Sequence, residues 1–562
     1  MSTARTNIVI GGGAGQGLVT VSHLFAKSLV RAGYDICCTQ DYMSRVRGGH
    51  NFMAIRVGRG VAAPTETIDL LVAMNAETVA LHRPELAPGA LVLLDASIAC
   101  QGAGCTPVPF KAFAPKPIFE NMAALGVLAA LMGIDIRVPA GLVADTLGKK
   151  GAAVVAQNET VLEAAYAWVA ERSLPFSPPA PVRDPKADPR LMLHGNEALG
   201  LGCLAGGVKF CAFYPMTPAT TIPQQLIAAR HAMGVLVEQV EDEIAAINMA
   251  VGAAVGGARA MVATSGGGFA LMTEGVSLAG VMETPVVVAL AQRPGPATGM
   301  ATRTEQADLD LALYAGHGEF PRAIFAPGDV EASFHLARRA FDVADRFQTP
   351  AFVLTDQWLA DCYRAVPPFD LSEPPRRAFS PDSLGDPASY ASYAMTDSGV
   401  SPRAVPGEGA HLVMADSHEH TPAGVVVEGK ENRAMMMEKR ARKEDGLRAE
   451  AMAPTLDGPR DADVLLVCWG STMGAAREAA ALLRDQGVPA AVLHFSQVWP
   501  LKPDDWLPIL HAAQTVVAVE GNFQGQFADL IRRVTGFVCH QRILRYDGRP
   551  ISPTYILDRL AG

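Results

Sequence analysis

The feature that most constrains the fold of this chain is the alternation of short, β-branched apolar runs with helical segments. Parallel strands need a long crossover connection, usually a helix, so this alternation predicts parallel α/β sheets. The expected strands fall into three blocks: 6–13, 34–40, 51–58, 68–75 and 90–97; then 209–215, 258–265, 284–292 and 322–327; then 462–470, 489–497 and 515–522, with a helix over 473–485.

Breaks in composition divide the chain into three α/β domains. Residues 174–190 are rich in proline and predict an extended linker between a domain at 1–173 and a domain at 191–370. Residues 371–460 are rich in turns and then in charge, and predict a connecting segment before a third domain at 461–562. A chain of this length with 49% hydrophobic residues can form several ordinary cores.

Charge and cysteine pattern exclude several functions. The net charge of −10 argues against a protein that binds nucleic-acid phosphates. No apolar run approaches the roughly 20 residues that cross a bilayer, and no signal-peptide pattern precedes the first strand, so a cytoplasmic location is expected. The nine cysteines contain no Cys-x-x-Cys pair. If the protein carries out redox chemistry, its metal centre is therefore expected on another chain, and no metal site is expected on this one.

A glycine-rich loop, "GGGAGQG" at 11–17, follows the first expected strand. It fails the G-x-G-x-x-G fingerprint in every register and lacks the G-x-x-x-x-G-K-[ST] pattern of a P-loop. The failed fingerprint disfavours an NAD-dependent dehydrogenase built on the first block. A tight strand-to-helix turn and a phosphate cradle both remain open.

A basic loop, "DYMSRVRGGHNFMAIRVG", places Arg45, Arg47 and His50 around a Gly-Gly turn. These groups could receive a carboxylate or a phosphate. A solvated loop at a subunit interface would explain them as well.

Three loops of the second block follow expected strands and carry polar groups. "FYPMTPATTIP" holds Thr217 between two prolines, "TSGGGFALMTEG" includes Ser265 and Gly266, and "LAQRPGPATGMATRTEQADL" begins a loop at Arg293. Ligands bind at the carboxyl ends of strands in such sheets, so convergence of these loops predicts a site. Taken alone, the Thr217 segment could equally be a helix N-cap with a nearby proline.

Four acids precede an apolar helical stretch in "VEQVEDEIAAINMAVGAAVG". Acids at a helix start favour the positive end of its dipole, which accounts for Glu238, Glu241 and Asp242. Glu243 is followed by 13 residues without charge, so its carboxylate is predicted to be drawn into the interior.

These motifs resemble those of a known family. "FYPMTPATT", "EQVEDEIAAINMAVGA", "ATSGGGFALMTE", "ETPVVVALAQRPGPATG", "HGEFPR" and "ENRAMMMEKRARK" resemble the α subunit of 2-oxoacid:ferredoxin oxidoreductases, especially the 2-oxoglutarate type. The first block, with "AGQG" and "DYMSRVRGGHN", resembles the γ subunit of the same enzymes, fused N-terminally. "FSQVWPLKPDDW" and "VAVEGNFQGQFADLIR" resemble a transketolase C-terminal-like domain.

The resemblance implies CoA-dependent oxidative decarboxylation of a 2-oxoacid, with 2-oxoglutarate expected. The cofactor would be thiamine diphosphate, bound between the pyrimidine-binding domain of this chain and a partner β subunit. That β subunit would carry the diphosphate-binding domain, Mg²⁺ and a 4Fe–4S cluster, and would pass electrons to ferredoxin. An (αβ)2 assembly is expected, inactive without its β chains.

The resemblance also assigns residues. Glu243 matches the acid that contacts the pyrimidine N1′ atom, Thr217 a threonine near the reacting 2-oxoacid, and Arg293 an arginine near the substrate carboxylate. The cofactor-binding set is Glu243, Tyr214, Pro215, Thr217, Ser265 and Gly266. The charge of the basic loop makes Arg45, Arg47 and His50 the candidates for contact with substrate or CoA.

Alternatives remain within and outside this class. The family often has an acidic "HDEYG"-like stretch where this chain has "DSHEHTPAG", a difference that bears on substrate choice. Pyruvate, branched-chain or aryl 2-oxoacids are therefore alternative substrates. A non-catalytic assembly subunit is the alternative from another class.

Overall fold

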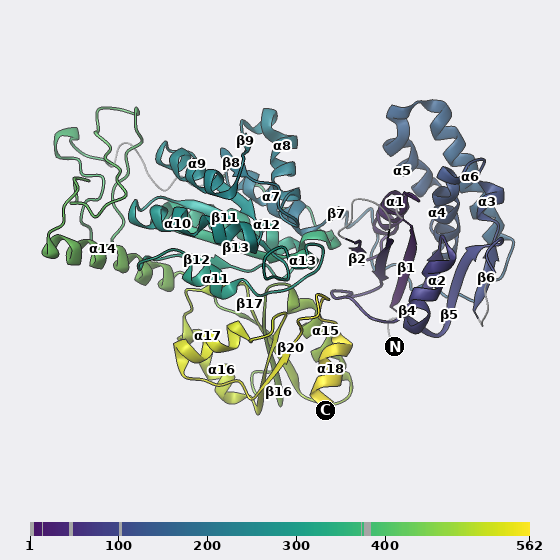
Figure 1. The fold of residues 1–562 in the computed structure, drawn as a ribbon. Helices are drawn as coiled ribbons and strands as arrows, with labels where there is room; N and C mark the ends of the chain where they lie inside the picture. Colours follow the sequence, from purple (N-terminus) through teal and green to yellow (C-terminus); the bar gives the residue numbers. More distant parts are fainter. Residues whose placement is uncertain are drawn as a thin grey trace. The chain divides into compact units, whose positions relative to one another are not determined.

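The computed structural model describes residues 5–13, 15–43, 49–99, 104–372, 374–375 and 384–561 (Figure 1). The chain forms two compact units. The first unit comprises Met1–His194, Asp361–Phe369 and Ser552–Gly562, and the second comprises Gly195–Ala360 and Asp370–Ile551.

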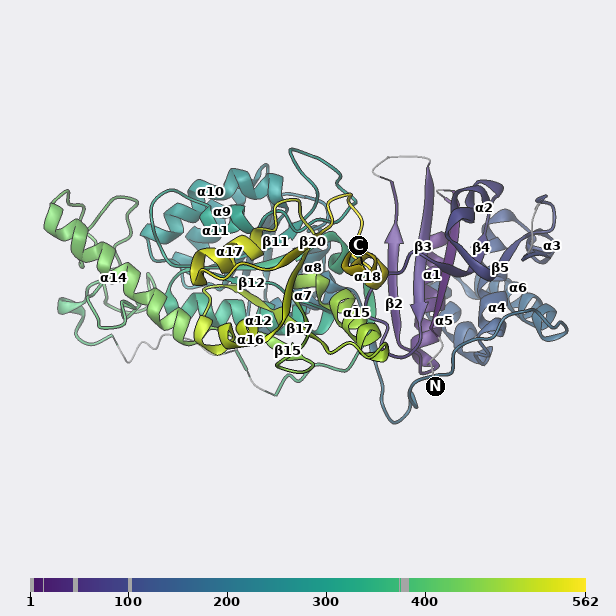
Figure 2. The ribbon, with the colours of Figure 1, turned by 90° about the horizontal axis from the view of Figure 1, so that it is seen from below.

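The first unit contains one sheet of eight strands in the order β6-β5-β4-β1-β3-β2-β14-β7. Helices α1 and α4 to α6 share a core with one face of this sheet, and α2 packs on the other face. Helices α4 and α6 pack against each other, as both views show (Figures 1 and 2).

The elements are β1 (Thr6–Gly13), α1 (Leu18–Arg31), β2 (Ile36–Asp41), β3 (His50–Val57), β4 (Ile68–Ala73), α2 (Ala76–His82), β5 (Leu86–Asp95), β6 (Cys105–Val108), α3 (Phe110–Phe113), α4 (Glu120–Leu131), α5 (Arg137–Leu147), α6 (Ala152–Ala170), β7 (Leu191–Leu193), β14 (Tyr363–Val366) and α18 (Pro553–Ala561).

This sheet is mixed, and the expectation of an all-parallel sheet in the first block is wrong. Strands β1, β4, β5 and β6 are parallel, but β3 lies antiparallel between β1 and β2. The connection from β2 to β3 is too short for a crossover helix, so it makes a hairpin.

The second unit contains a seven-stranded sheet in the order β18-β12-β13-β11-β10-β8-β9. Its strands are parallel except β18, which pairs antiparallel with β12. The elements are α7 (Gly195–Ala205), β8 (Phe210–Phe213), α8 (Thr221–Met233), β9 (Leu236–Gln239), α9 (Glu243–Val255), β10 (Ala260–Thr264), α10 (Gly266–Val281), β11 (Val286–Gln292), α11 (Leu309–Tyr314), β12 (Ala323–Phe325), α12 (Val330–Phe347), β13 (Pro350–Asp356) and α13 (Gln357–Asp361).

Helices cover both faces of this second sheet (Figure 1). Alternate strand residues such as Val262 and Val288 face α9 and α10, while Met261 and Val287 face α7, α8 and α12. Alternation of this kind follows from the two-residue period of a strand. It leaves the carboxyl ends of β8, β10 and β11 to carry the loops on which the site is built.

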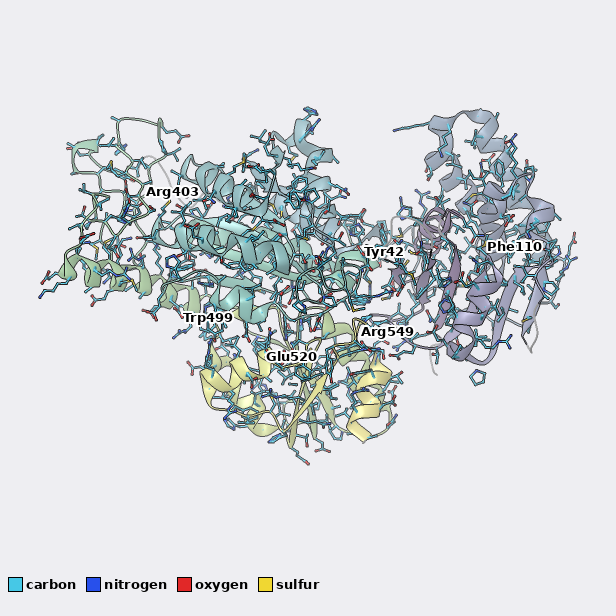
Figure 3. The ribbon with its side chains drawn as sticks, viewed as in Figure 1. Tyr42, Phe110, Arg403, Trp499, Glu520 and Arg549 are labelled. Carbon is cyan, nitrogen blue, oxygen red and sulfur yellow. The ribbon has the colours of Figure 1, made fainter. Side chains whose placement is uncertain are left out.

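A five-stranded sheet, in the order β15-β17-β16-β19-β20, completes the second unit. The buried carboxylate of Glu520, labelled in Figure 3, accepts hydrogen bonds from the Trp469 indole and from the backbone N–H groups of Phe527 and Ala528. This network fastens the start of α17 to β19. The elements are β15 (Thr455–Asp457), β16 (Val464–Trp469), α15 (Met473–Asp485), β17 (Ala490–Phe495), β18 (Gln497–Trp499), α16 (Leu507–Ala512), β19 (Thr515–Glu520), α17 (Gln526–Thr535) and β20 (Gln541–Leu544).

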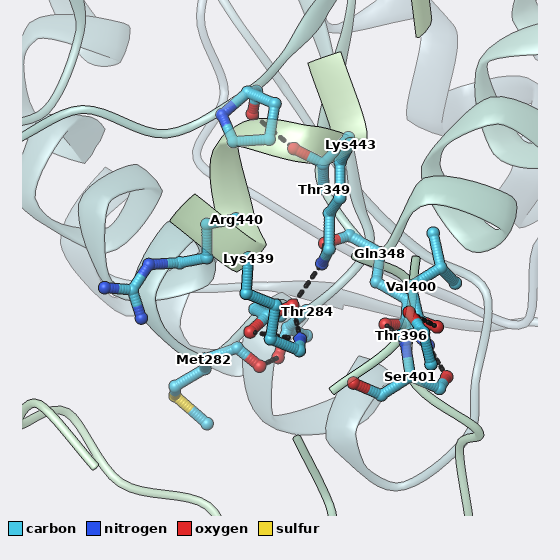
Figure 4. A network of polar contacts seen from close by, with 12 residues as sticks. Met282, Thr284, Gln348, Thr349, Thr396, Val400, Ser401, Lys439, Arg440 and Lys443 are labelled. Carbon is cyan, nitrogen blue, oxygen red and sulfur yellow. Dashed lines mark hydrogen bonds and ion pairs between the residues drawn. The ribbon is translucent and has the colours of Figure 1, made fainter. Parts of the chain in front are cut away.

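A buried ion cluster joins helix α14 (Lys430–Ala449) to Glu283, which follows α10, one of the helices that cover the seven-stranded sheet. Lys439 Nζ donates to Glu283 at 2.8 and 2.7 Å, and Lys443 Nζ is ion-paired with the same carboxylate. Lys443 also donates to the backbone carbonyl of Gln348, within the polar network of Figure 4. Burial opposes ionisation of Glu283, yet the two lysines outweigh it and hold its pKa below the usual value. The far end of α14 extends away from the sheet (Figures 1 and 2).

The three-domain α/β fold class is confirmed, with a sheet for each block. Every strand expected from the sequence overlaps an observed strand, and the helix expected over 473–485 is α15. The proposed domain limits stay predictions. In the part of the chain that the structure describes, no helix combines the length and apolar character required to span a membrane.

Candidate active site

Glu243 is the first residue of α9 and is 4% exposed, as predicted. Asp242 is the N-cap, and its Oδ1 atom accepts a 2.7 Å hydrogen bond from the N–H of Ala245. Because Asp242 caps the helix and Glu238 and Glu241 are exposed, Glu243 alone turns inward. Its Oε1 atom is buried and has no hydrogen-bond partner among the described residues. A buried carboxylate oxygen without a partner is costly, so it is a candidate contact for a ligand.

The turn from β10 into α10 lies against this carboxylate. A Cβ atom added at Gly268 would be 2.4 Å from Glu243 Oε1 and 2.3 Å from Thr264 Oγ1. Only glycine therefore permits this approach. Ser265, the N-cap of α10, is fully buried, and its hydroxyl has no hydrogen-bond partner in the described ranges.

Arg293 follows directly after β11 and is 8% exposed. Its Nη1 atom donates a 2.6 Å hydrogen bond to the carbonyl oxygen of Thr217, so the structure brings these two predicted residues together. The link uses the backbone carbonyl of Thr217 and not its hydroxyl. The Arg293 Nε atom is buried without a partner among the described residues. Burial lowers the pKa of Arg293, and the charge of Asp308 opposes that shift.

Tyr214 and Pro215 extend the same loop from the end of β8 and are exposed, Tyr214 to 40%. The loop is anchored from α7, where Asn196 Nδ2 donates to the Pro218 carbonyl at 2.8 Å and to Thr221 Oγ1 at 2.7 Å. The second-block residues assigned from the sequence therefore occupy loops of one sheet, on β8, β10 and β11 and at the start of α9.

Two acids of this region were missed by the sequence interpretation. A Cβ atom added at Gly266 would be 2.5 Å from Asp308 Oδ2, which is buried with no partner in the described part of the chain. Burial raises the pKa of Asp308 to about 6, against the opposing charge of Arg293. Burial and the charge of Asp308 raise the pKa of Glu305 to about 7. The segment "TEQADL" contained the signal, two acids three positions apart after Arg293.

The loop that carries these acids is held by the five-stranded domain. Gln306 Oε1 accepts from the N–H of Gly521 at 2.9 Å, and Gln306 Nε2 donates to the Trp469 carbonyl at 3.0 Å. Asn522 Nδ2 donates to the Gln306 carbonyl at 3.1 Å. The C-terminal domain thus fixes the base of the loop that follows Arg293.

His50 belongs to the first unit, while Glu243, Thr217 and Arg293 belong to the second. His50 Nε2 is 2.9 Å from His82 Nε2, and His82 Nδ1 is 2.6 Å from a Glu85 oxygen. His50 Nδ1 is buried and has no partner among the described residues. Arg45 and Arg47 lie outside the described residues.

A cavity of about 280 Å³ lies beside the glycine-rich loop of the first unit. It is lined by Gly13, Gly15, Gly17, Leu18, Val19, Gln40, Asn51, Phe52 and Met53. The loop is thus open to a small ligand, in addition to making the strand-to-helix turn.

Three family descriptions match successive parts of the chain. Residues 7–168 match "Pyruvate ferredoxin/flavodoxin oxidoreductase". Residues 201–439 match "Pyruvate flavodoxin/ferredoxin oxidoreductase, thiamine diP-bdg", the region that contains Glu243, Thr217 and Arg293. Residues 457–548 match "Transketolase, C-terminal domain".

Whole-chain similarity agrees with these matches. The chain is 31% identical to the 2-oxoacid:ferredoxin oxidoreductase subunit alpha of a Sulfolobus species, covering 97% of this chain and 95% of that relative. It is 32% identical to the 2-oxoglutarate synthase subunit KorA of Archaeoglobus fulgidus, over 66% of this chain and 98% of that relative. A solved structure of 2-oxoglutarate:ferredoxin oxidoreductase from Magnetococcus marinus has a TM-score of 0.93 at 29% identity and covers 99% of each chain. This chain therefore belongs to the family of 2-oxoacid:ferredoxin oxidoreductase α subunits, with a pyruvate ferredoxin/flavodoxin oxidoreductase domain on the same polypeptide.

Proposed function

We propose that this chain, together with a β subunit, catalyses CoA-dependent oxidative decarboxylation of 2-oxoglutarate to succinyl-CoA and passes the electrons to ferredoxin. The observation that carries the proposal is the Glu243 carboxyl group, whose Oε1 atom is buried without a partner among the described residues. It lies against a glycine turn, in the region that matches a thiamine diphosphate-binding family.

The residues present fit the pyrimidine half of thiamine diphosphate. When bound, this cofactor supplies the carbon nucleophile for attack on the ketone of the 2-oxoacid. The part of Glu243 is to share a proton with the pyrimidine N1′ atom through its free oxygen. Exclusion of water strengthens that hydrogen bond. Ser265 and Gly266 line the same turn, and Tyr214, Pro215 and Thr217 complete the proposed contacts.

Arg293 is the proposed carboxylate-binding group. Its Nη1 atom is committed to the Thr217 carbonyl, whereas its Nε atom has no partner in the described ranges. A substrate carboxylate can therefore approach the Nε edge of the guanidinium and accept charge-assisted hydrogen bonds there. Thr217, whose carbonyl oxygen Arg293 contacts, is the proposed neighbour of the reacting 2-oxoacid.

Support for 2-oxoglutarate comes from the named relatives. The Archaeoglobus fulgidus relative is a 2-oxoglutarate synthase subunit, and the Magnetococcus marinus structure has 2-oxoglutarate, coenzyme A and succinyl-CoA bound. Pyruvate, branched-chain and aryl 2-oxoacids are the alternatives that the assay below must separate.

The proposed β subunit supplies the diphosphate-binding domain, Mg²⁺ and a 4Fe–4S cluster, in an (αβ)2 assembly. Exposed apolar side chains on α9 and α10, the helices that carry Glu243 and Gly268, support a partner at these helices. Ile244 and Met249 of α9 are 47% and 42% exposed, and Leu271 of α10 is 52% exposed. Covering them would bury apolar surface.

CoA binding is proposed for the first unit, through Arg45, Arg47 and His50. His50 supports this because its Nδ1 atom is buried without a partner among the described residues, and the neighbouring residues Asn51 and Phe52 line the 280 Å³ cavity. Substitution of His50 by alanine is expected to raise the KM for CoA and not the KM for the 2-oxoacid.

The test is to reconstitute the αβ complex and measure viologen reduction with CoA and a panel of 2-oxoacids. The highest kcat/KM is expected with 2-oxoglutarate, and no turnover with either subunit alone. A preference for another 2-oxoacid refutes the substrate. Absence of turnover with every 2-oxoacid, in a complex that binds thiamine diphosphate, refutes the reaction.

A further inference from the structure

Asp308, the residue before α11, lies against the start of α10 and is hydrogen-bonded to the end of β11. Its carboxylate touches the start of α10 at Gly266, two residues before the glycine that touches Glu243. The backbone N–H of Asp308 donates a 3.0 Å hydrogen bond to Gln292 Oε1, which closes the loop onto the end of β11. Gln292 is the residue directly before Arg293. The Asp308 carboxylate is thus fixed beside both the cofactor turn and the substrate arginine.

Asp308 and Arg293 interact electrostatically, but each keeps a polar atom that has no hydrogen-bond partner among the described residues. Each is the charge that opposes the effect of burial on the other's pKa. Yet Asp308 Oδ2 and Arg293 Nε are both buried without a hydrogen-bond partner among the described residues. The guanidinium therefore has a nearby counter-charge and an open edge for a carboxylate ligand.

Other ionisable groups face Asp308 or its surroundings. Glu305, in the same loop, interacts with Asp308 as a like charge. Glu243 reaches the α10 turn from α9, at Gly268. Asp529 and Arg533 of α17, which packs against α11, act on Asp310 instead. The first ionisable residue of α10 itself is Glu274.

We propose that Asp308 is a positioning residue for the substrate arginine and that it takes up a proton from solvent when the 2-oxoacid carboxylate binds Arg293. This inference rests on the proposed function of the site. Before binding, the ionised Asp308 balances the Arg293 charge. After binding, two carboxylates face one guanidinium in a buried site. Keeping both carboxylates ionised at short range costs free energy, which favours protonation of one of them. The proton is transferred from water to Asp308, and no covalent bond to the substrate is made or broken.

The first test is the pH dependence of KM for the 2-oxoacid in the reconstituted complex. With Asp308 titrating near pH 6 in the free enzyme, a rise of about one pKa unit on binding makes KM increase about five-fold between pH 6 and pH 8. Asp308→Asn is expected to change KM over that interval by less than about two-fold. Asp308→Glu, which keeps a titratable group, is expected to retain the dependence.

Two matched variants locate the proton. Glu305→Gln and Asp310→Asn each remove a neighbouring acid, and both are expected to keep the pH dependence of KM. If Glu305→Gln abolishes the dependence and Asp308→Asn does not, the proposal is overturned. It is also overturned if Asp308→Asn, in an assembled complex, shows the wild-type pH profile.

The second test needs no variant. Glutarate carries both carboxylates of 2-oxoglutarate but no ketone, so its binding to the holoenzyme is followed without turnover. Calorimetry at pH 6.5 in two buffers of different ionisation enthalpy is expected to give an uptake of about half a proton or more per glutarate bound. Zero uptake with measurable glutarate binding overturns the proposal. A complex that oxidises no 2-oxoacid refutes the proposed function instead, whereas turnover with a pH-independent KM refutes only the role of Asp308.

Discussion

The Nη1 atom of Arg293 donates a 2.6 Å hydrogen bond to the carbonyl oxygen of Thr217, which joins the loop after β11 to the loop after β8. One end of the guanidinium is thereby committed to the protein, which restricts its orientation. A restricted orientation suits the carboxylate contact proposed for Arg293, because bidentate recognition depends on the plane of the guanidinium.

Arg293→Lys is expected to raise KM for the 2-oxoacid about 10- to 100-fold, since lysine keeps the charge but loses one charge-assisted hydrogen bond worth about 1.5–3 kcal/mol. The KM for CoA, measured in the same steady-state assays, serves as the internal control and should not change. Equal effects on both constants would point to misfolding and not to loss of the carboxylate contact.

Glu243→Gln is expected to lower kcat by about 100-fold or more in a complex that still assembles, because the amide cannot share a proton with the pyrimidine N1′ atom. Glu241→Gln, two residues earlier and exposed, is the matched control and should retain near-normal kcat. Near-normal turnover of the Glu243 variant would favour a non-catalytic assembly subunit.

Gly268→Ala is expected to reduce both stability and activity, because the new methyl group would lie 2.4 Å from Glu243 Oε1. Overpacking of this kind costs about 1–3 kcal/mol in the free energy of unfolding. Gly252→Ala in α9 is the control, since an added Cβ there meets no atom within 4 Å. That variant should be neutral or stabilising by up to about 1 kcal/mol, because alanine is the better helix former. Thermal unfolding of the full chain distinguishes the two, and equal melting temperatures would contradict the packing argument.

Glu283→Gln is expected to lower the free energy of unfolding by about 3–5 kcal/mol, because it leaves Lys439 and Lys443 buried without a counter-charge. Glu450→Gln removes an exposed partner of Arg346 and should cost about 1 kcal/mol or less. Urea unfolding at neutral pH provides the comparison.

The Glu283 carboxylate should also make the free energy of unfolding depend on pH. The pKa of Glu283 is lower in the folded chain than in the unfolded chain. Its contribution to stability is therefore fully present above the unfolded pKa, about 4.3, and is lost as the pH falls through the folded pKa. The difference in stability between wild type and Glu283→Gln should shrink in acid. A difference that stays constant down to pH 2 would contradict the ion cluster.

The sequence by itself determined the α/β class, because the two-residue period of a strand and the length of the intervening helical segments are local properties. It also identified Glu243 as the buried acid, because the uncharged helix that follows it is expected to pack in the interior and to draw the adjacent side chain with it. The catalytic and cofactor roles of Glu243, Thr217 and Arg293, and the CoA role of Arg45, Arg47 and His50, stay predictions for the variants above to test.

Only the tertiary structure decided the rest. The short connection after β2 is compatible only with an antiparallel β3, but the pairing of β3 with β1 on its other side is seen only in the fold. Lys439 and Lys443 lie in a highly charged segment whose composition predicts exposure to solvent. They are buried because Glu283, far away in sequence, lies opposite them and supplies the counter-charge. Asp308 is an ordinary helix-start acid until Gly266 and Arg293 enclose it. For these lysines and for Asp308 the physical reason is the same: desolvation and charge pairing depend on residues that are distant in the chain and adjacent only in the fold.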